Sequence, residues 1–346
     1  MRIGIDAMGG DHAPDAVLEG ALAAVTRFGD DDRLVLIGDE AIIRDHIEEA
    51  GLVDDPRIEI EPTTAVVEMA EPPVAAVRNK PDSSLVRMAW LGSKKAGEKR
   101  CDAVISAGNT GACAAAAQMH MRRLKGVHRP GIAVTIPAFG GPTVLCDVGA
   151  NPDPKPSHLH QYARMAAVYA REVVGIEGDP RVAILSIGGE EGKGNQLTRE
   201  THKLIKADAG LNYVGYIEGR GVFAGEADVV VCEGFTGNVV LKLSEGLAST
   251  IFEAVARELL EIDPEMAMRF EPVVKEIYRK HDYHEHGGAP LLGANGTCFI
   301  CHGSSVARTI TNAVKMAVTH HEHHVNDVIE RSLAEQADAL AAEGAA

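Results

Sequence analysis

Two carboxylates and an imidazole share one glycine turn near the start of the sequence. Asp6, Asp11 and His12 surround the pair Gly9 and Gly10. A short apolar run precedes this turn, and apolar residues with helical spacing follow it. A strand, a glycine turn and a helix start direct backbone N–H groups at an anion, and carboxylates and imidazoles are groups that move protons. The turn therefore predicts an active site for an anionic ligand.

Glycine and polar residues also follow five later strand-like runs, in the segments 107–112, 149–156, 188–195, 233–238 and 302–305. Asn109 and Thr110 suit the N-terminus of the helix expected after the first segment. The third segment resembles a P-loop, but Ile187 and Gly194 stand where that motif needs a glycine and a magnesium-binding hydroxyl. Each turn alone could be an ordinary capped connection. Together, without a dinucleotide or magnesium motif, they favour a site for a phosphate-bearing ligand.

The elements that would position these turns alternate between strands and helices. Strand-like runs lie at 2–6, 33–37, 102–106, 132–136, 143–147, 181–187, 213–217, 228–232 and 297–301. Segments with helical periodicity include 84–99, 110–124, 158–174, 197–207 and 239–260. This alternation predicts an α/β fold with a mostly parallel sheet and helices on both faces. Ligands of such folds bind beyond the carboxyl ends of the strands, where the turns lie.

The composition is that of an ordinary globular protein. The 346 residues are 45% hydrophobic and 24% charged, which excludes disorder and fibrous repeats. A formal net charge of −16 argues against nucleic acid as a partner. No apolar run approaches the roughly 18 residues of a membrane span, and Asp6 and Asp11 interrupt any signal-peptide pattern, so we expect a cytoplasmic protein. Six cysteines, mostly inside apolar runs, are expected to be reduced core thiols.

The last third of the sequence holds two further helical patterns. In the segment 265–281, basic residues flank a helical face that contains the apolar side chains Met266, Phe270, Val273, Val274 and Ile277. Such a stripe faces a membrane, a dimer partner or the chain's own core, and Pro272 should kink the helix unless the helix begins there. Asp327 as N-cap and Glu330 three residues later predict a C-terminal helix. We therefore expect a catalytic domain over 1–325 and a C-terminal helix and tail over 326–346.

Taken in order, the motifs closely resemble those of one family, the acyl-acyl carrier protein:phosphate acyltransferases of bacterial phospholipid synthesis (the PlsX family). The matching segments are 6–14, 76–80, 83–84, 106–111, 147–151, 193–195, 234–238, 287–288 and 302–305. Each segment is short, but their common order over residues 1–320 is specific. The sequence departs from the family pattern in the cysteines around the last strand, in 262–283, in the histidine-rich 320–324 segment and in the tail. These departures concern membrane and partner surfaces more than the reaction.

The resemblance implies an enzyme that transfers a long-chain acyl group from acyl carrier protein to inorganic phosphate, giving acyl phosphate and a free thiol. It implies a three-layer α/β/α fold similar to the phosphotransacetylases and to the isocitrate/isopropylmalate dehydrogenase-like fold, in a homodimer. A membrane glycerol-3-phosphate acyltransferase would consume the acyl phosphate, and the enzyme itself would be cytoplasmic with peripheral membrane association. We expect no cofactor and no metal ion.

Phosphate is already a nucleophilic anion, so the reaction needs positioning and charge stabilisation rather than a serine or cysteine nucleophile. We expect direct attack within a ternary complex. The residues expected to act in catalysis are Asp6, Asp11, His12, Asn109, Lys193, Asn195, Asn238 and His302. The residues expected to bind phosphate are Gly9, Gly10, Gly108, Thr110, Gly111, Thr236, Gly237, Ser304 and Ser305.

Within these sets, the backbone N–H groups of 108–111, with the side chains of Asn109 and Thr110, would hold phosphate. The tetrahedral oxyanion or the leaving thiolate would be stabilised by a group of polar side chains, Lys193, Asn195 and Asn238. A histidine, either His12 or His302, would manage a proton, oriented by Asp6 or Asp11.

A basic surface is needed to dock an acidic carrier protein. Arg122, Arg123, Lys125 and Arg129 lie together at the end of the helix that begins near Asn109. Basic residues also collect at helix C-termini because of the helix dipole, so both explanations of this cluster stay open.

Three alternative functions stay open as well. A phosphotransacetylase-like enzyme would use acyl-coenzyme A as its donor. A decarboxylating dehydrogenase on a similar sheet would need a dinucleotide site, but the first turn lacks the G-x-G-x-x-G motif. A non-catalytic scaffold for lipid-synthesis enzymes would have no use for five polar glycine turns.

Overall fold

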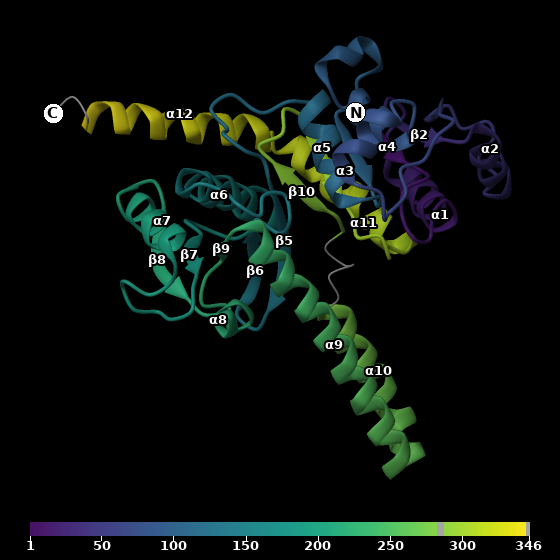
Figure 1. Ribbon diagram of the computed structural model, residues 1–346. Coiled ribbons are helices and arrows are strands. Elements are labelled where there is room, and N and C mark those ends of the chain that lie inside the picture. Colours follow the sequence, from purple (N-terminus) through teal and green to yellow (C-terminus); the bar gives the residue numbers. More distant parts are fainter. Residues whose placement is uncertain (282–286, 344–346) are drawn as a thin grey trace.

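One mixed sheet runs through the molecule (Figure 1). The computed structural model describes residues 1–281 and 287–343, and within them the sheet has eleven strands. In their order across the sheet, the strands are β3 Ile58–Pro62, β2 Arg33–Gly38, β1 Arg2–Asp6, β4 Ala103–Ser106, β11 Thr297–Ile300, β10 Ala289–Leu292, β5 Gly131–Ala138, β6 Gly141–Cys146, β9 Val229–Val231, β7 Arg181–Leu185 and β8 Asn212–Ile217.

Strand pairing is parallel on both sides of the sheet and antiparallel in its middle. From β3 to β11 all neighbours run parallel, as do those from β6 to β8. The pairs β11–β10, β10–β5 and β5–β6 are antiparallel. The mostly parallel α/β fold predicted from the sequence is confirmed. The strand β10 was not predicted, because it has only four residues and Pro290 cannot donate a ladder hydrogen bond.

The helices are α1 Asp15–Ala24, α2 Glu40–Glu49, α3 Pro73–Asn79, α4 Ser84–Leu91, α5 Thr110–His120, α6 Pro156–Tyr169, α7 Gln196–Lys206, α8 Gly219–Ala224, α9 Gly234–Ile262, α10 Pro264–His281, α11 Ala307–Glu322 and α12 Val325–Glu343. The helix expected over 84–99 ends at Leu91, and a 3-10 segment, Lys94–Lys99, follows. The prediction of Asp327 as an N-cap was wrong, because α12 begins at Val325 and places Asp327 in its first turn.

Alternate side chains of the strands point to opposite faces of the sheet, and helices cover both faces. On β11, Cys298 and Ile300 pack with residues of α4 and α5, whereas Phe299 packs with residues of α1 and α11. On the other half of the sheet, Val144 and Val229 pack with residues of α6 and α12. The sheet is therefore the middle layer of three. The six cysteines are all buried and free, as the sequence predicted.

The helices α9 and α10 lie side by side and project from the body of the protein (Figure 1). The stripe expected over 265–281 lies on α10, which continues through Pro272. Its described members Met266, Phe270 and Val273 are exposed, while the side chains of Val274 and Ile277 lie outside the described ones. Apolar side chains of α9, such as Leu247, are exposed too. The described part of the stripe is therefore not packed in the chain's own core.

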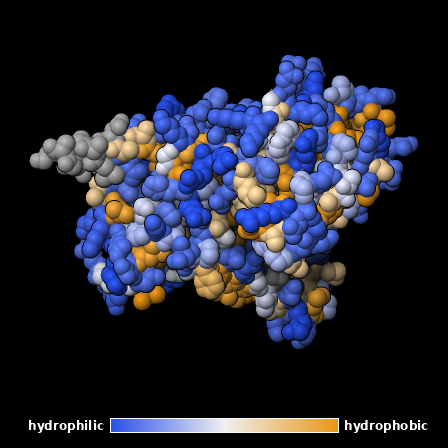
Figure 2. Space-filling model, turned by 45° about the horizontal axis from the view of Figure 1, so that its top comes forward, coloured by the Kyte–Doolittle hydropathy of each residue, from blue (hydrophilic) through white to orange (hydrophobic). Residues whose placement is uncertain are grey.

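The rest of the visible surface is mostly hydrophilic (Figure 2), as expected for a chain with a net charge of −16. Among the described helices, none is both long enough and apolar enough to cross a bilayer.

Candidate active site

Three loops meet at the carboxyl ends of β1, β4 and β11, which are neighbours in the sheet. The N–H of Asp11 donates to the carbonyl oxygen of Gly303 at 2.7 Å. Gly10 has a φ of +130°, and a Cβ there would lie 3.3 Å from both the Ala107 Cβ and the Gly303 oxygen. Glycine is therefore favoured at this position by its positive φ, and a Cβ would also press on its neighbours. The turn 6–14, the turn after β4 and the loop 302–305 form one surface.

Asp6 lies beneath this surface and is completely buried. Its carboxylate accepts a hydrogen bond from the Ser106 hydroxyl at 2.7 Å, and that hydroxyl accepts one from the Gly108 N–H at 3.0 Å. A Cβ on Gly9 would lie 2.4 Å from the Asp6 carboxylate. Burial raises the pKa of Asp6, against the effect of its hydrogen bonds. Asp6 therefore holds the two glycine loops together from below.

Asn109 caps α5, whose N-terminus faces the same edge of the sheet. The Asn109 side-chain oxygen accepts a hydrogen bond from the Ala112 N–H at 3.0 Å. Its amide nitrogen donates to the carbonyl oxygens of Met69 and Glu71, each at 3.0 Å. Both ends of this side chain are thus engaged within the protein, while the N–H groups of the first helical turn, beginning at Thr110, have no intrahelical partners.

On the other half of the sheet, the turn after β6 supports the start of α9. A Cβ on Gly237 would lie 1.9 Å from the Asp147 carbonyl oxygen, so only glycine allows this approach. The buried Asp147 carboxylate accepts hydrogen bonds from the N–H groups of Ile132 and Asn151 at 2.9 and 2.7 Å. Burial raises the pKa of Asp147 to about 6, although these bonds oppose the rise. The Thr236 hydroxyl donates to the N-cap residue Glu233.

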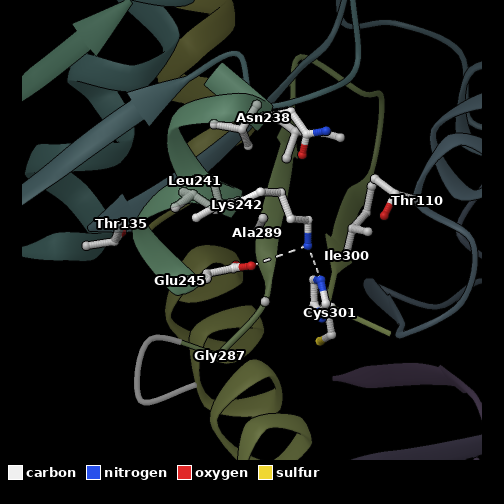
Figure 3. Close-up of a pocket in the computed structure, with 15 residues that line it drawn as sticks. Thr110, Thr135, Asn238, Leu241, Lys242, Glu245, Gly287, Ala289, Ile300 and Cys301 are labelled. Atoms are coloured by element: carbon white, nitrogen blue, oxygen red, sulfur yellow. Dashed lines mark hydrogen bonds and ion pairs between the residues drawn. The ribbon is translucent and has the colours of Figure 1, made fainter. Parts of the chain in front are cut away.

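A cavity of about 90 Å³, open to solvent, lies between these two groups of loops (Figure 3). Its polar lining comes from α5, α9 and the loop after β11, with Thr110, Asn238, Lys242, Glu245 and His302. Its apolar lining comes from both halves of the sheet and from α9, with Ile132, Val134, Val148, Leu241 and Ile300. The cavity therefore joins a helix N-terminus suited to an anion with a wall suited to hydrocarbon.

His302 lies in this cavity between a cation and a hydroxyl. Its Nδ1 lies 2.7 Å from the Ser304 hydroxyl, and its Nε2 contacts the Lys242 Nζ. Burial and, next, the charge of Lys242 lower the pKa of His302, whereas Glu245 and Asp11 raise it. The net shift is downward, so the imidazole is neutral around neutral pH and can accept a proton.

Comparison with known proteins decides the family. A family model described as "Fatty acid synthesis protein" matches residues 1–328. The phosphate acyltransferase of Desulfitobacterium hafniense is 45% identical over 320 residues, which are 92% of this chain and 93% of that protein. The phosphate acyltransferase of Geobacter sulfurreducens is 45% identical over 340 residues, 97% of this chain and 94% of that protein. The chain belongs to the phosphate acyltransferase family.

Solved structures agree on the fold of this phosphate acyltransferase. A phosphotransacetylase from Streptococcus pyogenes superposes with a TM-score of 0.63 at 15% sequence identity, over 93% of this chain and 94% of that chain. The EutD phosphotransacetylase from Staphylococcus aureus superposes with a TM-score of 0.59 at 17% identity, over the same shares of the two chains. At these identities the likeness shows a shared fold.

Some residues expected at the site of the phosphate acyltransferase lie elsewhere. Lys193 is exposed on the loop after β7, and Asn195 caps α7 by accepting a hydrogen bond from the Thr198 N–H at 2.9 Å. Neither lines the cavity, because β9 separates β7 from β6. His12 is exposed in the first turn, and Ser305 is buried.

Two lining residues, Lys242 and Glu245, were missed by the sequence analysis. Both follow Asn238 on α9, four and seven positions later, which places the three side chains on one helical face. This spacing was the available signal. The spacing alone could not identify these residues, because only the strand order shows which face of α9 lies toward His302.

The basic residues expected to dock a carrier protein gather at the other end of α5. Arg122, Arg123, Lys125 and Arg129 are all exposed, and three of them line a surface hollow. The eleven residues of α5 separate this cluster from Thr110 by about 16 Å along the helix.

Proposed function

We propose that this phosphate acyltransferase moves a long-chain acyl group from acyl carrier protein to inorganic phosphate. One observation carries the proposal: a single cavity combines the N-terminus of α5, the polar side chains Asn238 and His302, and an apolar wall. The helix N-terminus suits the phosphate, and the apolar wall suits the first carbons of an acyl chain. The names of the 45% identical relatives agree with phosphate as the acceptor.

The reaction is a direct displacement. An oxygen of hydrogen phosphate attacks the thioester carbonyl carbon, a C–O bond forms, and the C–S bond breaks with its electron pair on sulfur. The proton of hydrogen phosphate ends on that sulfur, so acyl phosphate and a free thiol are the products. The backbone N–H groups at 109–111 hold the phosphate, with the hydroxyls of Thr110 and Ser304 beside them, since the Gly108 N–H already donates to Ser106. Asn238 donates to the oxyanion that forms on the thioester carbonyl.

His302 is the base in this proposal, since it lines the cavity and its pKa is lowered. It takes the proton from phosphate and returns it to the thiolate, while Asp11 faces it from the first turn. Asp6 and Asn109 act through the loops that they position. Lys193 and Asn195 would contribute to oxyanion stabilisation only if the loop 188–195 approaches the bound substrates.

The proposed partners follow from the surface. The acidic carrier protein docks on the basic cluster at the end of α5, and its flexible prosthetic arm carries the thioester to the cavity. The exposed apolar side chains of α9 and α10 serve a homodimer or a peripheral contact with a membrane, where a glycerol-3-phosphate acyltransferase takes up the acyl phosphate. Flotation of the protein with anionic vesicles tests the membrane contact, and its absence at all vesicle concentrations would exclude it.

The proposed reaction is tested by incubating the purified protein with palmitoyl-acyl carrier protein, with and without inorganic phosphate. We expect acyl phosphate and free thiol to appear together, and only when phosphate is present. Turnover with palmitoyl-coenzyme A but not with the carrier protein would assign the enzyme a phosphotransacetylase-like donor instead. The absence of turnover with both donors would contradict the proposed function.

A further inference from the structure

Lys242 brings a positive charge into the cavity from the third turn of α9. Among the described residues that line the cavity, it is the one lysine or arginine. Its Nζ lies 3.3 Å from a Glu245 carboxylate oxygen and contacts the His302 Nε2 (Figure 3). Asn238 lies one turn earlier on the same side of α9, and Thr110 lies across the cavity. Lys242 therefore faces both the expected phosphate and the expected base.

A phosphate dianion in a partly apolar cavity needs a neutralising charge. The N–H groups of a helix N-terminus supply only a partial positive charge, of about half a unit. The side chains of Asn238 and Thr110 are neutral donors. A lysine ammonium is a common phosphate ligand in proteins, because it is a compact full charge on a flexible stem. Lys193 is exposed on the loop after β7 and does not line the cavity, so another residue must supply the neutralising charge.

We propose that Lys242 is a catalytic residue whose ammonium binds the attacking phosphate and, by moving to it, releases Nε2 of His302 to accept the phosphate proton. The inference rests on the proposed function and adds a residue to it. It assigns Lys242 a contact with the nucleophile itself, rather than only with a neighbouring side chain.

The hydrogen bonds around His302 fix the order of these steps. While the Lys242 ammonium donates to Nε2, that nitrogen carries no proton, so the single proton of the neutral imidazole is on Nδ1, 2.7 Å from the Ser304 hydroxyl oxygen. Nε2 is then the basic nitrogen. The Ser304 N–H, 3.2 Å from Nδ1, donates to that nitrogen only in the other tautomer. When the ammonium shifts from Nε2 to a phosphate oxygen, the lone pair of Nε2 is free to accept the phosphate proton. The same movement neutralises the phosphate and prepares its deprotonation.

The polar and charged groups that face His302 come from three segments. Lys242 and Glu245 face it from α9, Asp11 faces it from the turn after β1, and Ser304 faces it from its own loop. Both carboxylates raise its pKa, and Lys242 lowers it. Removal of the Lys242 charge therefore raises the pKa of His302. As the pH is lowered, the imidazole of a variant without this charge therefore becomes protonated at a higher pH than the imidazole of the parent enzyme.

The test uses two variants of Lys242 and one matched control. Lys242→Met removes the charge with little change in length, and Lys242→Arg keeps it. The control is Lys99→Met, because Lys99 also pairs with a mostly buried glutamate, Glu61, at 3.2 Å. The Lys242 and Lys99 side chains are 47% and 62% exposed, so neither loss should unfold the protein, and urea unfolding checks this.

Binding of inorganic phosphate, measured by calorimetry without an acyl donor, is the first readout. We expect Lys242→Met to weaken it at least tenfold and Lys242→Arg to weaken it less. In the transfer assay we expect kcat/KM for phosphate to fall about 10²-fold in Lys242→Met. In a plot of kcat/KM against pH, the fall on the acid side (the acid limb) should move to higher pH. Lys242→Arg should keep the acid limb near that of the parent. Lys99→Met should match the parent in every measurement.

Failure of this inference and failure of the proposed function give different results. If the parent transfers no acyl group from either donor while Lys242→Met still weakens phosphate binding, the reaction is wrong and the phosphate contact stands. If Lys242→Met binds phosphate as the parent does and its acid limb is unmoved, Lys242 has no catalytic role, whatever the acyl donor.

Discussion

Asn109 shows how one residue of this protein serves the fold and the site together. Its side-chain oxygen caps α5, and its amide nitrogen holds the loop that carries Met69 and Glu71. Asp6 has the same double use, since its buried carboxylate joins the first turn to the turn after β4 through Ser106. Residues of this kind are expected to change turnover without touching the substrates, because they set where the helix N-terminus points.

Asn109→Ala is predicted to lower turnover at saturating phosphate about 10²-fold, because the donors at the start of α5 lose their anchor. Loss of the cap itself should cost about 1 kcal/mol of unfolding free energy. The matched control is Asp39→Ala, since Asp39 caps α2 by accepting from the Ala41 N–H at 2.9 Å. The control should lose similar stability and keep its turnover. Equal turnover in both variants, with similar urea midpoints, would show that the cap of α5 has no catalytic importance.

His320 is predicted to make the protein sensitive to acid. It is buried, its Nδ1 lies 3.2 Å from the Thr297 hydroxyl, and burial lowers its pKa from 6.5 to about 3. Below about pH 6.5 this histidine is protonated in the unfolded chain but stays neutral in the folded protein. It therefore lowers the free energy of unfolding by about 1.4 kcal/mol per pH unit down toward pH 3. The contribution is absent above pH 6.5 and grows as the pH falls.

His320→Gln, which keeps a polar group beside Thr297, should therefore lose less stability on acidification. Between pH 7.5 and pH 5 the difference between the variant and the parent should change by about 2 kcal/mol in favour of the variant. Urea unfolding at the two pH values measures it. A constant difference would mean that His320 can be protonated in the folded protein.

At the scale of elements, the close approach of α1 and α11 holds the first turn against the loop 302–305. A Cβ on Gly20 of α1 would lie 2.2 Å from the Ala307 carbonyl oxygen of α11, and the Thr311 hydroxyl donates to the Gly20 oxygen at 2.8 Å. Both helices begin just after loops that form the candidate site. Their contact thus fixes the position of Gly303 relative to Asp11.

Gly20→Ala should destabilise the protein by about 1–3 kcal/mol, since the added methyl group forces the two helices apart. The same change at Gly246 should have the opposite sign. Gly246 lies on the exposed part of α9, and a methyl group added there would meet no atom within 4 Å, so alanine should add about 0.5–1 kcal/mol through helix propensity. Thermal unfolding of both variants tests this pair. A stabilising effect at Gly20 would contradict the close packing of α1 and α11.

At the scale of the whole molecule, the balance of charge bears on the proposed carrier-protein partner. With a net charge of −16, the protein repels an acidic carrier protein over most of its surface. The exposed cluster Arg122, Arg123, Lys125 and Arg129 is a local exception. It lies at the end of α5 opposite to the cavity, so the proposed docking and the proposed chemistry would use the two ends of one helix.

Charge reversal of Arg122 and Arg123 to glutamate should raise KM for the carrier protein by about tenfold. It should leave kcat unchanged, because neither residue lines the cavity. The effect should shrink as ionic strength rises. The control is reversal of Lys206 and Arg220, which are exposed basic residues on α7 and α8. An unaltered KM in the Arg122 and Arg123 variant would leave the helix dipole as the explanation of the cluster.

The sequence by itself determined the short-range features of this protein. Strands, turns and helix starts depend on neighbouring residues, so the turns around Gly9 and Gly108, and most elements of the sheet, could be predicted from spacing alone. The order of the motifs was also sufficient to recognise the family that the comparisons confirm. The exceptions were elements with weak local signals, such as β3 and the proline-containing β10.

Only the tertiary structure decided which of these turns meet. The strand order places β1, β4 and β11 side by side and β7 farther away, so His302 joins the cavity and Lys193 does not. The contact between Lys242 and His302 spans sixty positions in the sequence and depends on packing around the antiparallel middle of the sheet. The exposed stripe on α10 had the same spacing as a core stripe. Periodicity reports which side chains share a face, whereas what that face meets is fixed by long-range packing.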